Sequence, residues 1–253
     1  MQDRHVPALT TRYWFAFTAA TVFGANAGDT VEAWLSAWTV AELYLHLPLL
    51  LLVYVGTLVI ERFDLSETHA WYWLAVVVAL PASNELGDVA ALQMGIGRSG
   101  VFALLLAVLA VSHLMFRTQT TWLLALHMKS RRPRAVPLTD AAYWIALVMA
   151  STAGALANDY FAFTRKLDAP VALVALSAGV AVAIALYFQR RVSRILSYWL
   201  LVVALSAFGN AAGRLLMEQP SLGRIGSVIL SGVVLAALLA TLRMRRTDSE
   251  LQS

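Results

Sequence analysis

Long apolar runs separated by short polar connections dominate the chain. The runs are roughly 17–24 residues long, enough to cross a bilayer of ~30 Å at ~1.5 Å per helical residue. Eight such runs follow one another, at 13–34, 39–60, 71–92, 99–117, 142–163, 170–189, 197–217 and 224–243. The pattern predicts an all-α membrane protein with eight transmembrane helices.

A second pattern repeats within the apolar runs. Each odd-numbered run opens on a tyrosine-tryptophan pair: Tyr13-Trp14, Tyr72-Trp73, Tyr143-Trp144 and Tyr198-Trp199. Fifteen residues after each tryptophan stand Asp29, Asp88, Asp159 and Arg214, and no gap is needed to align them. A fixed internal period of this kind indicates tandem structural units. The chain therefore reads as four copies of a two-helix unit.

The elements of this repeat have separate physical meanings. Tyrosine and tryptophan favour the membrane–water interface, so we expect the pairs to anchor the odd helices there. Small residues four apart, such as Gly24 and Gly28, share one helical face and let a second helix approach closely. Because each unit contains two spans, the four copies point the same way. We expect four parallel two-span repeats around an axis along the membrane normal.

The repeat resembles a family of uncharacterised bacterial membrane proteins built from four tandem two-helix repeats. The resemblance rests on the four tyrosine-tryptophan starts and on the repeat ends "NAGD" and "ELGD", with "LAND" as a variant and "AAGR" as a departure. It covers the chain from about 13 to 243. It implies the repeat architecture and carries no implication for activity.

Composition and charge placement support a membrane location. The 253 residues are 60% hydrophobic and 13% charged, whereas soluble domains have about 25% charged residues. Fourteen lysines and arginines lie on one predicted side of the membrane and four on the other. The positive-inside rule then places both termini in the cytoplasm, in a bacterial inner membrane. The basic loops are explained by this topology, so no nucleic-acid partner is expected.

The longest connection divides the sequence in two. Residues 118–140 contain the basic stretch "KSRRPR" and separate a first half, 1–117, from a second half, 141–246, which is followed by a tail at 247–253. The chain has no cysteine, so disulfides and thiolate metal sites are excluded.

The fourth repeat has an arginine where the other three have an aspartate, which suggests an ion cluster. A charge at membrane depth is costly unless it is paired or hydrated. We therefore expect the Arg214 guanidinium to reach at least one repeat aspartate, with Asp88 favoured, because the second copy lies opposite the fourth. The candidate substrate- or ion-binding residues are Asp29, Glu85, Asp88, Asp159 and Arg214.

Further acidic residues and one histidine occur at the same predicted depth. Glu42 and His46 stand four apart on one helical face, and carboxylates with an imidazole suit a hard or borderline divalent cation. The candidate metal ligands are Asp29, Glu32, Glu42, His46, Glu85, Asp88 and Asp159. Two alternatives stay open. Glu32 and Glu42 could face water, and the aspartates could form a structural network with Arg214 and the asparagines 84, 158 and 210.

These features predict a transporter or exporter of a small cation, a divalent metal ion in the first instance, with proton coupling as an option. The alternative is a non-transporting membrane subunit or sensor in which the Asp/Arg cluster is a structural clasp. The sequence has no Walker motif, nucleophile elbow or HExxH, so no catalytic residue and no enzyme activity are predicted. No cofactor is assigned beyond a metal ion as substrate or ligand. The partners expected are lipid and a small cation, and small-residue faces leave a homo-oligomer open.

Overall fold

The computed structural model describes residues 6–36, 42–63, 69–93, 95–107, 139–189 and 194–250, and within these ranges the chain is all-helical, as predicted. The helices are α1 (Thr11–Ser36), α2 (Glu42–Phe63), α3 (Ala70–Asp88), α5 (Ala141–Asp159), α6 (Ala169–Phe188), α7 (Arg194–Met217) and α8 (Gly223–Glu250). Two π-helical segments, η1 (Val89–Gln93) and η2 (Tyr160–Thr164), continue α3 and α5. A shorter apolar helix covers Arg98–Ala107.

Six of the described helices are long and apolar enough to cross a membrane: α2, α3, α5, α6, α7 and α8. They agree with six of the eight predicted spans. Helix α1 has 26 residues, but it carries Asn26, Asp29 and Glu32 and falls outside this set. The predicted span 99–117 is described only to residue 107, and the connection 118–140 lies outside the described residues up to 138.

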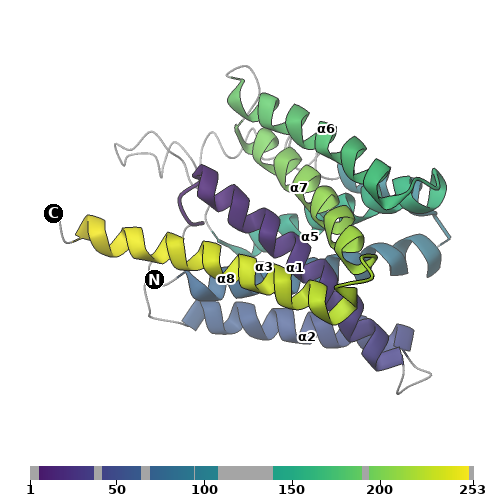
Figure 1. Cartoon of the computed structure of the whole chain (residues 1–253), viewed down its shortest axis with the longest axis horizontal. Coiled ribbons are helices and arrows are strands. Elements are labelled where there is room, and N and C mark those ends of the chain that lie inside the picture. Colours follow the sequence, from purple (N-terminus) through teal and green to yellow (C-terminus); the bar gives the residue numbers. More distant parts are fainter. Residues whose placement is uncertain are drawn as a thin grey trace.

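Four of the described helices form the inside of the bundle. Helix α1 packs against α3, α3 against α5, α5 against α7, and α7 back against α1, so the four make a closed ring across both halves of the sequence. In the membrane-length segments of α3, α5 and α7, 50–61% of the residues are buried, against 17–22% in α2, α6 and α8. Figure 1 accordingly shows α2 and α6 at opposite edges of the molecule.

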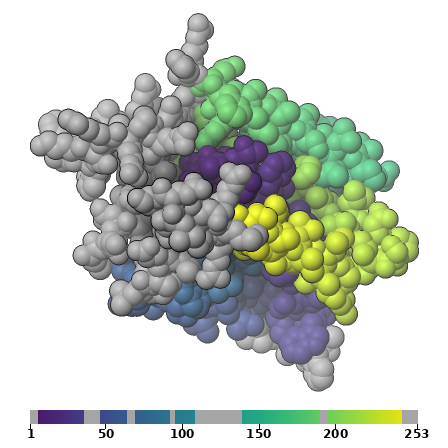
Figure 2. Space-filling view, turned by 60° about the vertical axis from the view of Figure 1, so that its left-hand side comes forward, coloured from purple at the N-terminus to yellow at the C-terminus, as the bar shows by residue number. Residues whose placement is uncertain are grey.

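Each outer helix packs on the inner helix of the next repeat, and the last outer helix packs on the inner helix of the first repeat. Helix α2 packs on α3, α6 on α7, and α8 returns to α1. The helix Arg98–Ala107 follows the same rule, because Val101 packs with Leu156 of α5 in one apolar cluster. The outward faces carry large apolar side chains such as Leu52, Val174 and Ile225, and α6 and α8 lie on the outside in Figure 2. Faces of this kind are expected of helices that contact lipid.

The small residues of the repeat do allow the inner helices to approach closely. A Cβ on Gly24 would lie 2.9 Å from Cβ of Leu80, and one on Gly154 would lie 2.6 Å from Cβ of Ser206. Added atoms at these distances would clash, so only glycine fits these contacts. The prediction for the small-xxx-small positions is confirmed at these helix pairs.

The tyrosines of the repeat point into the bundle, so the expectation that their hydroxyls meet water at the membrane interface is wrong. Their hydroxyl oxygens meet inside the bundle in a closed cycle, which we call the tyrosine ring: Tyr13 to Tyr72 at 2.7 Å, Tyr72 to Tyr143 at 2.7 Å, Tyr143 to Tyr198 at 3.0 Å and Tyr198 to Tyr13 at 3.0 Å. Each hydroxyl can donate one hydrogen bond and accept one. The four therefore satisfy one another without water, which permits their burial at 0–4% exposure.

The tryptophans surround this ring in a regular way. Trp73 packs on Tyr13, with ring centroids 5.5 Å apart, and the other three tryptophans take the equivalent places on the neighbouring tyrosines at 5.4–5.6 Å. One helical turn further along each inner helix stands a fully buried apolar side chain. We call these four the apolar layer: Phe17, Val76, Leu147 and Val202. Because one ring holds the start of all four inner helices, these helices run parallel.

Candidate functional site

The repeat aspartates lie at the opposite end of the inner helices, which we call the aspartate end. Asp88 and Asp159 are the last residues of α3 and α5, and each is followed directly by a π-helical segment. A π-helical turn changes the direction of the side chains that follow it and is frequent at functional sites. The two copies therefore depart from a regular α-helix at the same place in the repeat.

Arg98 joins these two aspartates. Its Nη2 lies 3.4 Å from Oδ1 of Asp88, and its Nε lies 3.5 Å from Oδ2 of Asp159. The guanidinium also lies over the ring of Phe163, 4.8 Å from the centroid. One arginine thus touches two carboxylates and one aromatic face, and these come from two inner helices.

A glycine turn brings Arg98 to this position. Gly95 and Gly97 both have positive φ, +69° and +76°, a conformation that glycine adopts without strain. The amide of Gly97 donates to the carbonyl of Ala91 at 3.1 Å, which closes the turn. The chain reverses there, so the side chain of residue 98 returns over Asp88, ten positions earlier.

Arg214 does not contact a repeat aspartate, and that prediction is wrong. Its Nε lies 2.9 Å from Oε1 of Glu218, one turn further along the chain, and its guanidinium lies 5.8 Å from the Phe163 ring centroid. A carboxylate at i+4 satisfies the charge locally, so Arg214 has no need to cross to another helix. Its guanidinium still lies near Phe163, the ring that Arg98 also contacts, at the edge of the group formed by Arg98, Asp88 and Asp159.

Asp29 lies on the other side of the aspartate end. It is within electrostatic range of Asp88, Glu85, His46 and Arg224, and no described residue forms an ion pair with it within 4.0 Å. Glu85 in turn lies 3.0 Å from Nδ1 of His46, a nearly buried imidazole at 2% exposure. Four of the five predicted ion-binding residues, all except Arg214, thus belong to one connected electrostatic cluster.

An amide pair lies below the aspartates on the axis of the bundle. Nδ2 of Asn84 donates to Oδ1 of Asn210 at 2.7 Å, and Nδ2 of Asn210 donates to the carbonyl of Ser206 at 2.9 Å. Helices α3 and α7 are opposite each other in the ring of four, so this bond crosses the axis. The equivalent positions of α1 and α5 are Ala25 and Ala155, which leave room for it.

The predicted metal ligands are only partly brought together. Among the described side chains, no three of histidine, aspartate or glutamate are placed so that they could share a metal ion. His46 and Glu85 form one pair, and Asp88 and Asp159 are joined through Arg98. The side chain of Glu42 lies outside what the structure describes, and Glu32 is partly exposed.

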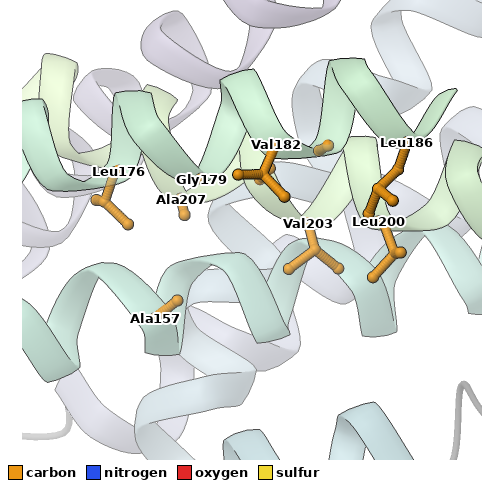
Figure 3. Close-up of a pocket in the computed structure, with 10 residues that line it drawn as sticks. Ala157, Leu176, Gly179, Val182, Leu186, Leu200, Val203 and Ala207 are labelled. Atoms are coloured by element: carbon orange, nitrogen blue, oxygen red, sulfur yellow. The ribbon is translucent and has the colours of Figure 1, made fainter. Parts of the chain in front are cut away.

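A groove of about 250 Å³ lies apart from this cluster, between α6 and α7 with Ala157 of α5 at its floor. Figure 3 shows that its walls, including Leu176, Val203 and Leu200, are hydrocarbon only. It offers no polar group to a cation, so it has no part in the candidate site.

Comparison with known proteins adds no assignment. No known protein family matches the chain, and no curated protein and no solved structure is significantly similar to it. The resemblance to a four-repeat bacterial family stays a prediction.

Arg98 and Phe163 are the site residues that sequence reasoning missed. In the sequence, Arg98 counts only as one of the four basic residues on the outer side of the membrane. The signal that could have found it is the pair of glycines in "GIGR", which indicates a tight reversal directly after an aspartate-bearing helix.

Proposed function

We propose that the protein is a multi-pass membrane transporter of a small cation, which binds at the aspartate end of the inner bundle. The observation that carries the proposal is an excess of carboxylates there. Among the described residues, Arg98 and Arg224 act on the aspartates of the group formed by Asp29, Glu85, Asp88 and Asp159, whereas Arg214 at the edge of the cluster is paired with Glu218. When all four carboxylates are ionised, two negative charges remain after Arg98 and Arg224 are counted, and one negative charge remains even when His46 is protonated. At membrane depth such an excess is costly without a bound cation or protons.

The proposal includes eight spans in four parallel repeats around one axis. Two features support it: the tyrosine ring joins equivalent residues of four helices, and each outer helix packs on the next inner helix. Helix α1 begins and helix α8 ends at the same side in Figure 1, which fits both termini in the cytoplasm of a bacterial inner membrane. A divalent metal ion has less support than a monovalent or organic cation, because the described carboxylates do not form a three-ligand group.

Flux measurements in proteoliposomes test the proposal. The parent protein is reconstituted and compared with empty vesicles for uptake of manganese, zinc, sodium, protons and a small organic ammonium ion. Asp29→Asn and Asp159→Asn should lower the flux about tenfold or more, since each removes a charge worth at least ~1.4 kcal/mol of binding. Asp168→Asn is the matched control, because Asp168 is exposed at the start of α6 and its side chain makes no capping hydrogen bond. Absence of flux of every cation in the parent would overturn the proposal.

A structural clasp is the second candidate, and the bridging position of Arg98 favours it. One arginine that holds α3 and α5 together could stabilise the bundle without any transported ion. In that case the Asp→Asn variants lose stability and the parent shows no cation flux. The two candidates are thus separated by the same set of proteins.

A further inference from the structure

The tyrosine ring lies at the end of the inner bundle opposite the proposed cation site. All four tyrosines are nearly or fully buried, and the hydrogen-bond cycle closes on the axis around which the inner helices pack. The proposed cation site uses none of them. A cluster of four buried hydroxyls that join all four inner helices needs its own explanation.

The dimensions of the ring leave no opening at its centre. Neighbouring oxygens are 2.7–3.0 Å apart, so in a square arrangement each lies about 2 Å from the centre. A water molecule needs about 2.7–2.8 Å from each oxygen that it bonds. Water therefore does not fit inside the closed ring, and each hydroxyl already uses its donor on a neighbour.

A second barrier lies directly behind the first. The apolar layer stands one helical turn further into the bundle, and its four side chains are all fully buried: Phe17, Val76, Leu147 and Val202. Hydrophobic constrictions block ions because water leaves them. The two layers together separate the tyrosine end from the polar half of the axis, which contains the Asn84–Asn210 pair.

The ring is built to open as a unit. Moving one tyrosine away leaves each of its two neighbours one hydrogen-bond partner short in a place that water does not reach, which is costly for each of them. Tyr198 is the weakest corner, because both of its hydrogen bonds are 3.0 Å, whereas both bonds of Tyr72 are 2.7 Å. An opening movement would therefore begin where α7 meets α1 and α5.

We propose that the tyrosine ring and the apolar layer form a closed gate across the axis, which makes the cation site accessible from the aspartate end alone in this conformation. The proposal deepens the proposed function, because it rests on passage of a cation along this axis. It assigns to the four tyrosines the role of the barrier that must open for the cation to leave on the far side.

Accessibility of single cysteines tests the gate directly, since the natural chain has no cysteine. Val76→Cys places a thiol in the apolar layer, behind the ring as seen from the tyrosine end. A small cationic methanethiosulfonate, which does not cross bilayers, is added to either side of proteoliposomes. We expect almost no labelling of Val76→Cys from the tyrosine end while the ring is intact.

Removal of one tyrosine should open this route. Tyr198→Ala in the Val76→Cys background should raise labelling from the tyrosine end at least roughly tenfold, which equals ~1.4 kcal/mol of barrier. Tyr54→Ala is the matched control, because Tyr54 is also a buried tyrosine but donates to the carbonyl of Trp144 outside the ring. Where Tyr198→Ala does not give a monodisperse protein, Tyr143→Ala takes its place.

The outcomes separate the gate from transport. Fast labelling of Val76→Cys with the ring intact, or no rise in either ring variant, overturns the gate whether or not the parent carries cations. A parent without cation flux overturns the proposed function, while the labelling pattern still reports whether the axis is closed. A rise in labelling with Tyr54→Ala equal to that with Tyr198→Ala would assign the effect to general loosening and would also overturn the gate.

Discussion

Replacing Arg98 by glutamine removes a guanidinium that two carboxylates and one aromatic ring share. Its two ion-pair distances are 3.4 and 3.5 Å, and Asp88 is 42% exposed. Exposed ion pairs contribute about 0.2–1 kcal/mol each, and an exposed cation–π contact contributes about 0.5–1 kcal/mol. We therefore expect Arg98→Gln to lower the free energy of unfolding by about 1–3 kcal/mol. This is less than the ~3–5 kcal/mol typical of breaking a fully buried pair.

The assay is thermal unfolding of the purified protein in detergent. For a chain of this size, 1 kcal/mol corresponds to about 2–4 °C, so a loss of about 1–3 kcal/mol should lower the midpoint by about 2–12 °C. Arg214→Gln is the matched control, because it removes an exposed pair with Glu218 worth only about 0.3–0.5 kcal/mol and a longer contact with the Phe163 ring at 5.8 Å, but no contact with a repeat aspartate. A midpoint for Arg214→Gln as low as that for Arg98→Gln would refute the reasoning. So would a double-mutant cycle of Arg98→Gln with Asp88→Asn that gives no coupling.

Two further predictions concern packing and the ring. Gly154→Ala should cost about 1–3 kcal/mol of stability, because its Cβ would lie 2.6 Å from the carbonyl oxygen of Val203. In the control Gly179→Ala the added Cβ meets nothing within 4 Å, so this variant should gain up to about 1 kcal/mol of helix propensity. Equal thermal midpoints of the two variants in detergent would contradict this prediction. Tyr143→Phe should cost about 1–3 kcal/mol of stability, since it leaves two neighbouring hydroxyls short of a partner. This loss should exceed that of Tyr54→Phe, which removes one hydrogen bond of 3.3 Å. A larger loss of stability in Tyr54→Phe than in Tyr143→Phe would count against the ring.

The helices were predictable because their signal is long and uniform. Each apolar run exceeds the length that a soluble core requires, and the fixed register of the tyrosine-tryptophan pairs places the inner helices in parallel. The small-residue contacts also followed from spacing, because residues four apart share one helical face whatever the surroundings. Such inferences need only the geometry of one helix.

The direction of the aromatic rings and the choice of ion-pair partners were not predictable in the same way. A tyrosine at the end of a membrane helix satisfies its hydroxyl either with water at the interface or with other hydroxyls in a dry ring of four, and the packing of four helices decides between the two. Arg214 found Glu218 on its own helix, while Arg98 reached Asp88 through a glycine turn. Spacing along the sequence does not reveal how far a turn carries a side chain back.

The bundle keeps fourfold equivalence at the tyrosine ring and abandons it at the asparagine level, for a reason that can be tested. Four hydroxyls satisfy one another in a cycle, whereas two amides satisfy one another as a pair: Asn84 and Asn210 bond across the axis, and Ala25 and Ala155 occupy the equivalent positions of the other two helices. Each asparagine is thus the partner of the other. Asn84→Ala alone should strand the carbonyl oxygen of Asn210, and Asn210→Ala alone the amide of Asn84, at about 1 kcal/mol or more each.

The double replacement should cost less than the sum of the two single replacements by about 1 kcal/mol, because the second change removes a group that the first had already left unpaired. Thermal midpoints of the four proteins in detergent, with Ser177→Ala as an exposed control whose hydroxyl bonds only within α6, measure this difference. Strict additivity would mean that water replaces the lost partner at once, and the axis at this level would then be open to solvent from the aspartate end. A coupling near 1 kcal/mol would mean that the amide pair closes the axis itself.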